Sequence, residues 1–400
     1  MDATLSRQAA IAHPWLKAGG SEAAVLRGLS LLGRTQNVTF LTGGDVELDR
    51  LNQHCGTSLD SGDFRVLRPS RLAWRSIGRT DALRGAVFQR FCQSVAAQFD
   101  VLISCYNLLD FGRPAIQFIA DLSFDEGLRR MYAPPPYGMW NWAYRPSPLR
   151  RAYLALARRI AGRSAYDGRQ DMVVANSRWM ADVLSSKRGI NAQRVVYPPV
   201  VGDAPAVPWN RKEVGFTVLG RIAPEKRIER VIEILSRVRS LGHDVHLHVI
   251  GATGSDAYGR SIRGTIDENR DWVFSEGRLD GERKMALLAA HRYAIHGCVA
   301  EAFGIAVAEM VKAGCIPFVP DDGGQVEIVG DGRLCYRDVD DAVSKIDRVL
   351  RCEEIQRSLT EHLRRQGELF SAERFMSEFR NVVEEFWHTR QDAISAAARA

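Results

Sequence analysis

Two cations, Arg221 and Lys226, lie close together in the segment Gly220-Arg-Ile-Ala-Pro-Glu-Lys, which follows the apolar run at residues 215–219. An arginine presents a planar fork of donors to a phosphate, and a lysine presents a compact point charge. Such a pair at the end of a strand could hold a diphosphate. The alternative interpretation is that both are exposed residues at the start of a helix.

Two glutamates, Glu301 and Glu309, flank the turn Phe303-Gly304-Ile305, which follows the apolar run at residues 294–298. Gly304 permits a sharp strand-to-helix turn, which would place Glu309 on the first turns of the next helix. Glu301 would then lie in a loop, and Glu309 could accept hydrogen bonds from two vicinal hydroxyls. Lone glutamates on a helix are usually solvated, but glutamates around an apolar turn favour a binding site.

Glycines mark two further strand ends. Gly19-Gly20-Ser21-Glu22 follows the run at residues 9–12 and precedes a predicted helix, so its backbone could approach a phosphate at the helix N-terminus. Glycine turns before helices are also common without a ligand. A third turn, Asp322-Gly-Gly, follows the run at residues 316–319. Because ligands of open parallel sheets bind beyond the carboxyl ends of the strands, these turns predict one shared site.

Short apolar runs alternate with helical stretches along the whole chain. The predicted strands cover residues 9–12, 38–41, 64–67, 100–103, 115–119, 172–175 and 195–197 in the first half, and 215–219, 245–250, 272–274, 294–298 and 316–319 in the second. Strands that are apolar throughout and separated by helices predict parallel sheets covered on both faces. The expected fold class is therefore α/β, with two Rossmann-like, doubly wound domains facing a cleft.

A proline-containing crossing divides the two halves, beginning at Tyr197-Pro-Pro-Val200 and continuing to Trp209. Prolines remove backbone donors and fix the chain, so we predict a first domain over residues 1–199 and a second over residues 200–371. A last helix within residues 372–400 has no strand after it and could pack back on the first domain. Its apolar stripe consists of Phe375, Phe379, Val382, Val383 and Phe386.

The composition is that of an ordinary globular protein, with 46% hydrophobic and 26% charged residues. No apolar run approaches the roughly 20 residues of a membrane-spanning helix, and no secretory leader is apparent, so we expect a cytoplasmic protein. The net charge of +6 is uneven, because residues 1–200 hold 26 Lys and Arg against 16 Asp and Glu. This basic half could face an anionic acceptor or membrane surface, or be an ordinary solvated surface. No nucleic-acid motif accompanies the charge, so we expect no nucleic-acid partner.

Metal-ligating side chains form no complete set in the sequence. The seven cysteines are scattered without a Cys-x-x-Cys pair, which predicts buried thiols rather than disulfides or zinc ligands. His246 and His248 share one face of a predicted strand, but no third ligand is apparent, so we expect ordinary histidines and no metal. His13, close to the first glycine turn, is a candidate for the cleft.

Several motifs together resemble family 4 of the retaining glycosyltransferases, which have the GT-B fold. These motifs are Glu301-x7-Glu309, Phe303-Gly304-Ile305 and Gly323-Gly324-x-x-Glu327-Ile-Val. The resemblance runs over nearly the whole chain and is densest over residues 215–329. The stretch from Ile295-His296 to Ile305 particularly resembles the members that use GDP-mannose.

The resemblance implies a retaining hexosyltransferase that moves a sugar from a GDP- or UDP-sugar to a hydroxyl acceptor, such as a glycan or a lipid-linked molecule of polysaccharide biosynthesis. It implies that the second domain holds the donor and the first the acceptor. Arg221 and Lys226 would neutralise the leaving diphosphate, Glu309 would bind the ribose and Glu301 would contact the sugar. The other implied donor-binding residues are Gly19, Gly20, Ser21, Gly220, Arg278, Leu279, Phe303, Gly304 and Ile305. No metal or other cofactor is expected, because cations and helix dipoles carry the charge.

Two positions depart from the family pattern. Where many relatives have a histidine near the sugar, this chain has Ala120-Asp121, so we expect Asp121 to replace the imidazole or the sugar to be oriented differently. Arg227 follows Lys226 where the family usually has glycine. A sugar-nucleotide epimerase, a pseudo-glycosyltransferase and a non-catalytic sugar-nucleotide-binding module remain alternatives. A nicotinamide-dependent dehydrogenase is disfavoured, because no Gly-x-Gly-x-x-Gly follows the first strand.

The segment at residues 131–159 combines aromatic and basic side chains. These are Trp140, Trp142, Tyr144, Arg145, Arg150, Arg151, Arg158 and Arg159. Such a combination is typical of a peripheral contact with an anionic membrane, here at its inner face, or of a site for a lipid-linked diphosphate. A loop packed by its own aromatics before an amphipathic helix is the alternative.

Overall fold

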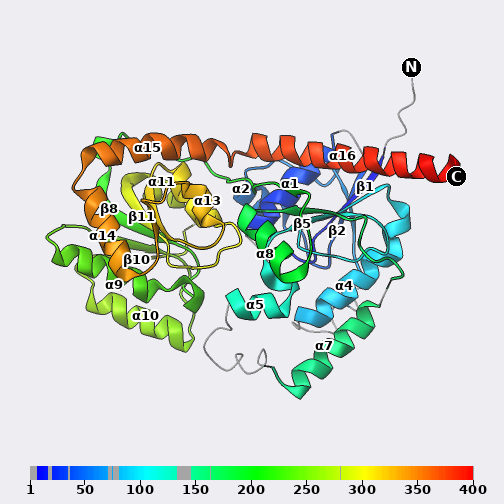
Figure 1. Cartoon of the computed structure of the whole chain (residues 1–400), viewed down its shortest axis with the longest axis horizontal. Helices are drawn as coiled ribbons and strands as arrows, with labels where there is room; N and C mark the ends of the chain where they lie inside the picture. The colour runs from blue at the N-terminus through cyan, green and yellow to red at the C-terminus, as the bar shows by residue number, and fades with distance from the viewer. Residues whose placement is uncertain are drawn as a thin grey trace.

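The computed structural model describes residues 7–16, 20–34, 37–70, 74, 81–132, 146–162, 164–279 and 281–399. Two lobes, each built on a parallel sheet, lie side by side, and the last helices run along the top of both (Figure 1). The predicted α/β class, with two doubly wound domains of the GT-B type, is confirmed.

The first lobe contains a seven-stranded parallel sheet of order β3-β2-β1-β4-β5-β6-β7. Its strands are β1 (Gln8–Ala12), β2 (Asn37–Leu41), β3 (Arg65–Leu67), β4 (Val101–Ser104), β5 (Ile116–Ile119), β6 (Met172–Ala175) and β7 (Arg194–Val195). Its described helices are α1 (Gly20–Leu32), α2 (Leu48–Cys55), α4 (Asp81–Val95), α5 (Glu126–Tyr132), α7 (Pro148–Ala161) and α8 (Arg178–Arg188). Strands β4, β5 and β6 are buried throughout, as expected of strands covered on both faces.

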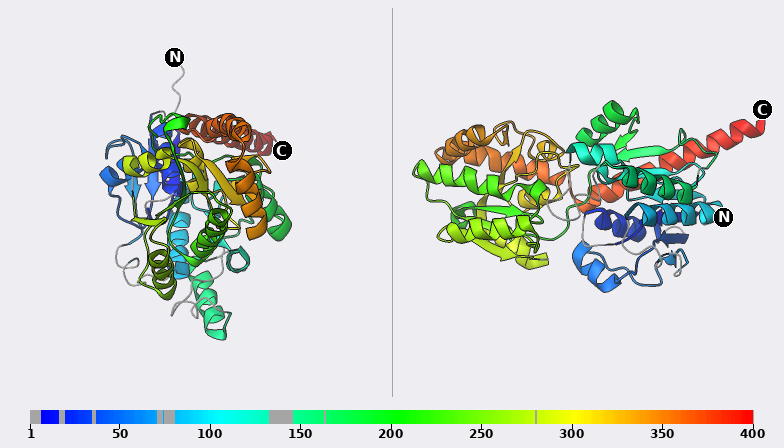
Figure 2. Two further views of the ribbon diagram at one scale, coloured as in Figure 1. Left: turned by 90° about the vertical axis from the view of Figure 1, so that its left-hand side faces the viewer. Right: turned by 90° about the horizontal axis from the view of Figure 1, so that it is seen from below.

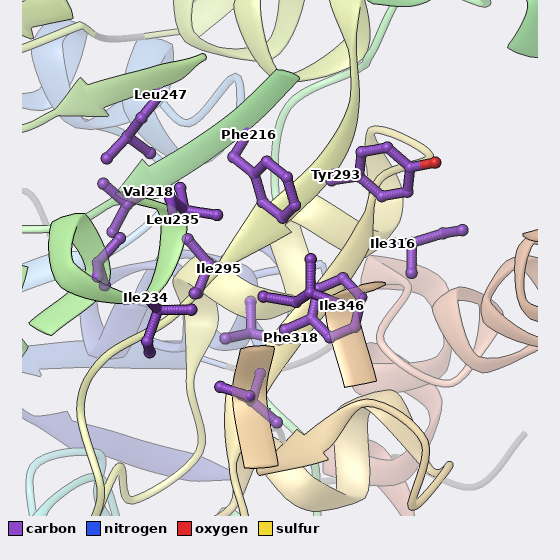
Figure 3. Packing of buried hydrophobic residues seen from close by; sticks show 14 of the residues in the cluster. Phe216, Val218, Ile234, Leu235, Leu247, Tyr293, Ile295, Ile316, Phe318 and Ile346 are labelled. Atoms are coloured by element: carbon purple, nitrogen blue, oxygen red, sulfur yellow. The ribbon is translucent and has the colours of Figure 1, made fainter. Parts of the chain in front are cut away.

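The second lobe contains a six-stranded parallel sheet of order β10-β9-β8-β11-β12-β13. Its strands are β8 (Glu213–Leu219), β9 (Leu247–Ile250), β10 (Val273–Gly277), β11 (His291–Ile295), β12 (Ile316–Pro320) and β13 (Cys335–Tyr336). Its helices are α9 (Ile228–Ser240), α10 (Ala257–Glu268), α11 (Gly281–Ala290), α12 (Ile305–Lys312), α13 (Gln325–Val329), α14 (Val339–Leu350) and α15 (Glu353–Glu368). Phe216, Tyr293 and Phe318 from three neighbouring strands pack together in its core (Figure 3).

Some predicted strand boundaries were wrong. The strand predicted at residues 294–298 is β11, which begins at His291 and ends at Ile295. Tyr293 and Ala294 pair with both β8 and β12, and beyond Ile295 the chain leaves the sheet to form the loop that carries Glu301. The strand predicted at residues 195–197 is the two-residue edge strand β7, because Pro198 and Pro199 have no N–H group for a sheet ladder. The two-residue strand β13 was not predicted.

The last helix, α16 (Ala372–Arg399), leaves the second lobe and lies along the first (Figures 1 and 2). Its apolar stripe belongs to the same buried cluster as β1 and α1, and Phe379 stacks on Phe118 at 5.0 Å between ring centroids. Arg7 and Glu384 form an ion pair at 2.8 Å at the outer end of this contact. The chain therefore crosses between the lobes twice, and Val200 N donates to Phe370 O at 3.0 Å where the two crossings meet.

The seven cysteines form no disulfide, and six of them are buried, as the sequence predicts. Burial raises the pKa of the Cys105 and Cys315 thiols to about 12, so both remain protonated and unreactive.

Candidate active site

A cavity of about 330 Å³ lies between the two lobes, lined by residues from both. The first lobe contributes Ser21, Ala24, Cys105, Phe118, Ile119, Ala120, Asp121, Asn176, Val196 and Pro198, the second contributes Lys226, Glu301, Ala302, Phe303, Gly304, Ile305 and Ala306, and α16 contributes Phe375. The walls are largely apolar, with a few polar side chains converging from opposite sides. This arrangement is typical of a small-molecule site between domains.

Lys226 and Glu301 form an ion pair at the second-lobe wall of the cavity, with 18% and 20% of their side chains exposed. Glu301 Oε1 also lies 3.1 Å from His296 Nε2, and because a carboxylate accepts, the imidazole donates. Burial alone would raise the pKa of the Glu301 carboxyl, but the Lys226 ammonium and the His296 hydrogen bond outweigh it and hold the pKa well below its ordinary value. Burial lowers the pKa of His296, so its imidazole is neutral at pH 7. The wall therefore carries a fixed carboxylate and a fixed ammonium.

Close backbone packing holds Lys226 in place. Lys226 is the last residue of the short 3-10 turn η4 (Pro224–Lys226). Gly297 packs against the Lys226 backbone so closely that a Cβ on Gly297 would lie 2.4 Å from the Lys226 carbonyl oxygen. Arg227, the next residue, has φ +48°, in the left-handed region. Glycine adopts this conformation most easily, so Arg227 holds a backbone conformation that residues with a side chain rarely adopt.

The first residues of two helices line the cavity, and the free backbone N–H groups of a helix lie at that end. Ile305 and Ala306 at the start of α12 line it from one side, and Ser21 near the start of α1 lines it from the other. Gly304 has φ +106° and makes the turn into α12, as its sequence context predicts. Helix N-termini attract anions, so together with Lys226 they form a site suited to a phosphate group.

The first-lobe wall is ordered by Asn107, a buried residue with φ +80°. Its Oδ1 accepts from the backbone N–H groups of Ala120 and Asp121, and its Nδ2 donates to Asp121 Oδ1 at 2.8 Å. Asn176 Nδ2 donates to the Ala120 carbonyl at 2.7 Å from the other side. Asp121, predicted to stand where relatives have histidine, therefore lines the cavity in a fixed orientation.

His13 lies close to the start of α1, with its Nε2 3.2 Å from Ser21 Oγ and its ring 4.8 Å from that of Tyr106. It is fully buried, and burial lowers its pKa to about 3. A neutral imidazole in this position orients the Ser21 hydroxyl, which also donates to Glu22 Oε2 at 3.0 Å. His13 does not line the cavity itself, and it contacts the lining only through the Ser21 hydroxyl.

Glu309 lies on α12 as expected. Its carboxylate forms an ion pair with Lys284, a residue that sequence analysis missed. Lys284 Nζ on α11 lies 2.7 Å from Glu309 Oε1, and both side chains are nearly buried. Burial raises the pKa of the Glu309 carboxyl, and the Lys284 charge opposes that shift. Glu309 lies outside the cavity lining, so a ribose would have to bind in an adjoining part of the cleft.

Four other predicted site residues, Gly220, Arg221, Arg278 and Leu279, follow the carboxyl ends of β8 and β10 but are not in the cavity lining. Arg221 is 77% exposed and pairs with Glu225 at 2.8 Å. Gly220 has φ +151°, a conformation that favours glycine. Its carbonyl oxygen approaches the neighbouring Gly251 so closely that a Cβ on Gly251 would lie 1.8 Å away. Arg278 is exposed and Leu279 half-buried after β10. Gly19 lies outside the described residues, and Gly20 begins α1.

The residues that sequence analysis missed include Asn107, Asn176 and Lys284. Asn107 lies shortly after β4 and Asn176 directly after β6, so both stand at the carboxyl ends of parallel strands, where polar residues are candidates for a site. Their positions in the sequence could therefore have identified both. Lys284 carries no such signal, because it lies within a helix whose other polar residues face solvent. Only the packing of α11 against α12 brings it to Glu309.

Residues 203–366 match the family model described as glycosyl transferases group 1. The structure is similar to that of WaaG, a glycosyltransferase involved in lipopolysaccharide biosynthesis, with a TM-score of 0.65 and 15% identity over 94% of this chain and 99% of that one. It is also similar to sucrose-phosphate synthase from Thermosynechococcus elongatus, with a TM-score of 0.69 and 17% identity over 96% and 100% of the two chains. The chain has the GT-B fold of glycosyltransferases.

A third GT-B neighbour, HepE of Anabaena in complex with UDP and glucose, has a TM-score of 0.64 and 14% identity over 95% of this chain and 100% of that one. No curated protein sequence matches the chain. At these identities the solved structures show the fold alone. The match of residues 203–366 to the family model adds that the second lobe is similar to the group 1 glycosyltransferase domain. Together they support a glycosyltransferase enzyme.

None of the helices in the described part of this GT-B chain is long and apolar enough to cross a membrane. The predicted cytoplasmic location and the membrane contact remain predictions.

Proposed function

We propose that this chain is a retaining hexosyltransferase that moves a sugar from a GDP- or UDP-sugar to a hydroxyl acceptor, a glycan or a lipid-linked molecule. The observation that carries the proposal is the interlobe cavity, in which a buried ammonium and two helix N-termini converge from both lobes. Fixed positive charge that requires no reorganisation is what a leaving diphosphate needs.

In the reaction, the bond between the anomeric carbon and the diphosphate oxygen breaks, and a bond to the acceptor oxygen forms on the same face of the sugar. The leaving phosphate takes the acceptor proton, so no side-chain base is needed. Lys226 and the α12 N-terminus would hold the phosphate charge, and Arg221 would join them by leaving its exposed pair with Glu225. Asp121 and Glu301, on opposite walls, would orient the sugar hydroxyls.

Metal independence is part of this proposal. His296, Cys298 and Glu301 offer ligand atoms within 4.8 Å of one another, but the Lys226 ammonium already binds Glu301, and a second cation there would be repelled. Burial also raises the pKa of the Cys298 thiol to about 12, which disfavours the thiolate that a metal requires.

The proposal is tested by incubating the protein with isotope-labelled GDP- and UDP-hexoses and acceptor extracts, and by identifying the products. Transfer with unchanged anomeric configuration supports it. A new sugar nucleotide formed without acceptor would indicate an epimerase, a product that joins cyclitols would indicate a pseudo-glycosyltransferase, and binding without turnover would indicate a binding module. Thermal-shift screening against GDP, UDP, ADP and dTDP sugars first selects the donor, because a ligand that binds only the native state stabilises it.

We expect Glu309→Ala to raise the dissociation constant of the donor by about 10-fold or more, while kcat changes less. A hydrogen bond to a charged group contributes about 1.5–3 kcal/mol, and ribose contacts are the same in the ground and transition states. The measurement is donor affinity by calorimetry together with steady-state kinetics. Glu282→Ala, an exposed glutamate in the first turn of α11, is the matched control and should leave donor affinity unchanged. Unchanged affinity in Glu309→Ala would remove the ribose assignment.

We also propose that the chain makes a peripheral contact with an anionic membrane, and helix α7 supports this contact. Leu149, Leu156 and Ile160 lie exposed on one stripe of this helix. Arg151, Arg158 and Arg159 are also exposed, and the first two lie on the side of the helix away from that stripe. A basic helix with an apolar stripe is suited to an anionic membrane interface. Arg150 is not part of this surface, because it pairs with Glu126. The aromatic residues predicted to join it, at 140, 142 and 144, lie outside the described residues.

We expect the wild-type chain to float with anionic liposomes and not with neutral ones. The triple variant Arg151→Glu, Arg158→Glu, Arg159→Glu should lose most of that binding, because each basic residue near the surface contributes about 1 kcal/mol. A control with the same charge change, Arg260→Glu, Arg263→Glu, Arg270→Glu on the second lobe, should float like the wild type. Equal recovery of the wild type with both lipids would contradict the contact.

A further inference from the structure

Three histidines meet at the amino ends of strands in the second lobe, on the edge of the sheet opposite the candidate active site. His246 precedes β9, His248 lies within it and His291 begins β11. One ring nitrogen of each lies within 4.8 Å of the others, and the Nε2 atoms of His246 and His291 are 3.1 Å apart. Sequence analysis found only the first two, because His291 reaches them across β8 and not along the chain.

We infer that these three histidines form a binding site for a transition-metal ion of the zinc class, with Glu213 as the fourth ligand. Glu213 Oε2 lies 3.4 Å from His246 Nε2 and 3.9 Å from His291 Nε2. Ligand nitrogens around tetrahedral zinc lie roughly 3.3–3.4 Å apart, because each bond is about 2.0–2.1 Å long. The distance of 3.4 Å between His246 Nε2 and Glu213 Oε2 matches this value. A small inward rotation of the partly exposed His248 would bring its ring nitrogen to a similar distance from the other ligands.

The hydrogen bonds behind the rings fix the tautomers that a metal requires. His291 Nδ1 donates to the Leu287 carbonyl at 2.8 Å, and His248 Nδ1 donates to Glu276 Oε1 at 2.7 Å. Both rings therefore keep an unprotonated Nε2. Backbone carbonyls and carboxylates behind the ring are the usual partners of metal-binding histidines.

The backbone leaves space for this cluster at Gly215 in β8. A Cβ at that position would lie 2.3 Å from His246 Nε2, so any other residue would displace the imidazole. Glycine in the interior of a strand weakens it and often marks a close approach. Here that approach brings His246 across β8 toward His291. A bound ion would tie together β8, β9 and β11, and its position at the amino ends of the strands indicates a structural rather than a catalytic role.

The test uses the full-length chain without a histidine tag, stripped with a chelator and titrated with Zn²⁺ by calorimetry and with Co²⁺ by visible absorption. We expect one ion per chain, a tetrahedral cobalt spectrum and a rise in Tm with Zn²⁺. The double variant His246→Ala, His248→Ala should lose binding, and Glu276→Gln should weaken it about 10–100-fold. The control His388→Ala, an exposed histidine on α16, should bind as the wild type does.

No saturable uptake by the wild type would overturn the inference, as would equal affinity in the double variant. Loss of binding in the control would also overturn it by assigning the ion to another site. The wild-type titration and cobalt spectrum require no substituted protein, so the result stands even where a variant folds poorly. The inference does not depend on sugar transfer, because every readout is binding or stability.

Discussion

Lys226→Ala is expected to lower kcat by a factor of about 10²–10³, because removal of one preorganised charge donor typically costs that much. Lys226 is the cation that lines the cavity, and its ammonium is fixed by Glu301 before any donor arrives. The same substitution should lower the free energy of unfolding by about 3–5 kcal/mol, because it leaves a buried carboxylate without its partner. Steady-state kinetics and urea denaturation measure the two effects separately.

The double variant Lys226→Met, Glu301→Gln is the control that separates folding from catalysis. It removes both charges of the pair, so stability should return most of the way to wild type while kcat remains low. Recovery of kcat along with stability would contradict a direct role for Lys226. Arg221→Ala is expected to lower kcat by the same order of magnitude with little change in stability, because Arg221 is exposed in the unliganded chain.

Glu327→Ala is expected to lower the free energy of unfolding by about 2–4 kcal/mol and to lower kcat/KM by loosening the two lobes. Glu327 lies on α13 of the second lobe, yet it caps α8 of the first. Its Oε1 accepts from Trp179 N at 2.7 Å, and its Oε2 accepts from Arg178 N at 3.0 Å and from the Tyr197 hydroxyl at 2.9 Å. Hydrogen bonds to a charged group contribute about 1.5–3 kcal/mol each, and a carboxylate at a helix N-terminus is favoured by the dipole.

Calorimetric unfolding and steady-state kinetics would measure this effect. Glu353→Ala is the matched control, because Glu353 is an exposed glutamate in the first turn of α15 and should change neither quantity by much. Two more contacts join the same surfaces, since Trp179 Nε1 donates to Asp322 and Ser177 Oγ donates to the Ala302 carbonyl. A Glu327→Ala variant with wild-type stability and kcat/KM would show that these two contacts suffice.

Much of the fold could be predicted from the sequence, because buried parallel strands are apolar throughout and stand out between helices. All twelve predicted strands exist, although β11 begins three residues before its predicted start. That error arose because His291 and Arg292 begin the strand with polar side chains. The two-residue strand β13 was missed because so short a segment has no periodicity to detect.

The candidate site was predicted in part for a similar reason. Glycines and charges after a strand mark its carboxyl end, so Lys226, Glu301 and the α12 turn were found, and the structure brings them together. Contacts between elements distant in the sequence leave no such mark. Lys284 reaches Glu309 from another helix, and Glu327 reaches α8 from the other lobe. The spacing of residues along one segment cannot predict either contact.

The path of α16 has a consequence for how the protein is made. The buried cluster of the first lobe includes Phe375, Phe379 and Phe386, which are synthesised only after the whole second lobe. A Cβ at Gly28 on α1 would lie 2.9 Å from the Phe379 ring, so α16 packs directly on that helix. Domains usually fold in order during synthesis. Here the first lobe keeps an apolar face uncovered until the second lobe and α16 have both been synthesised. We therefore expect nascent chains that stop before residue 372 to need chaperones or to aggregate.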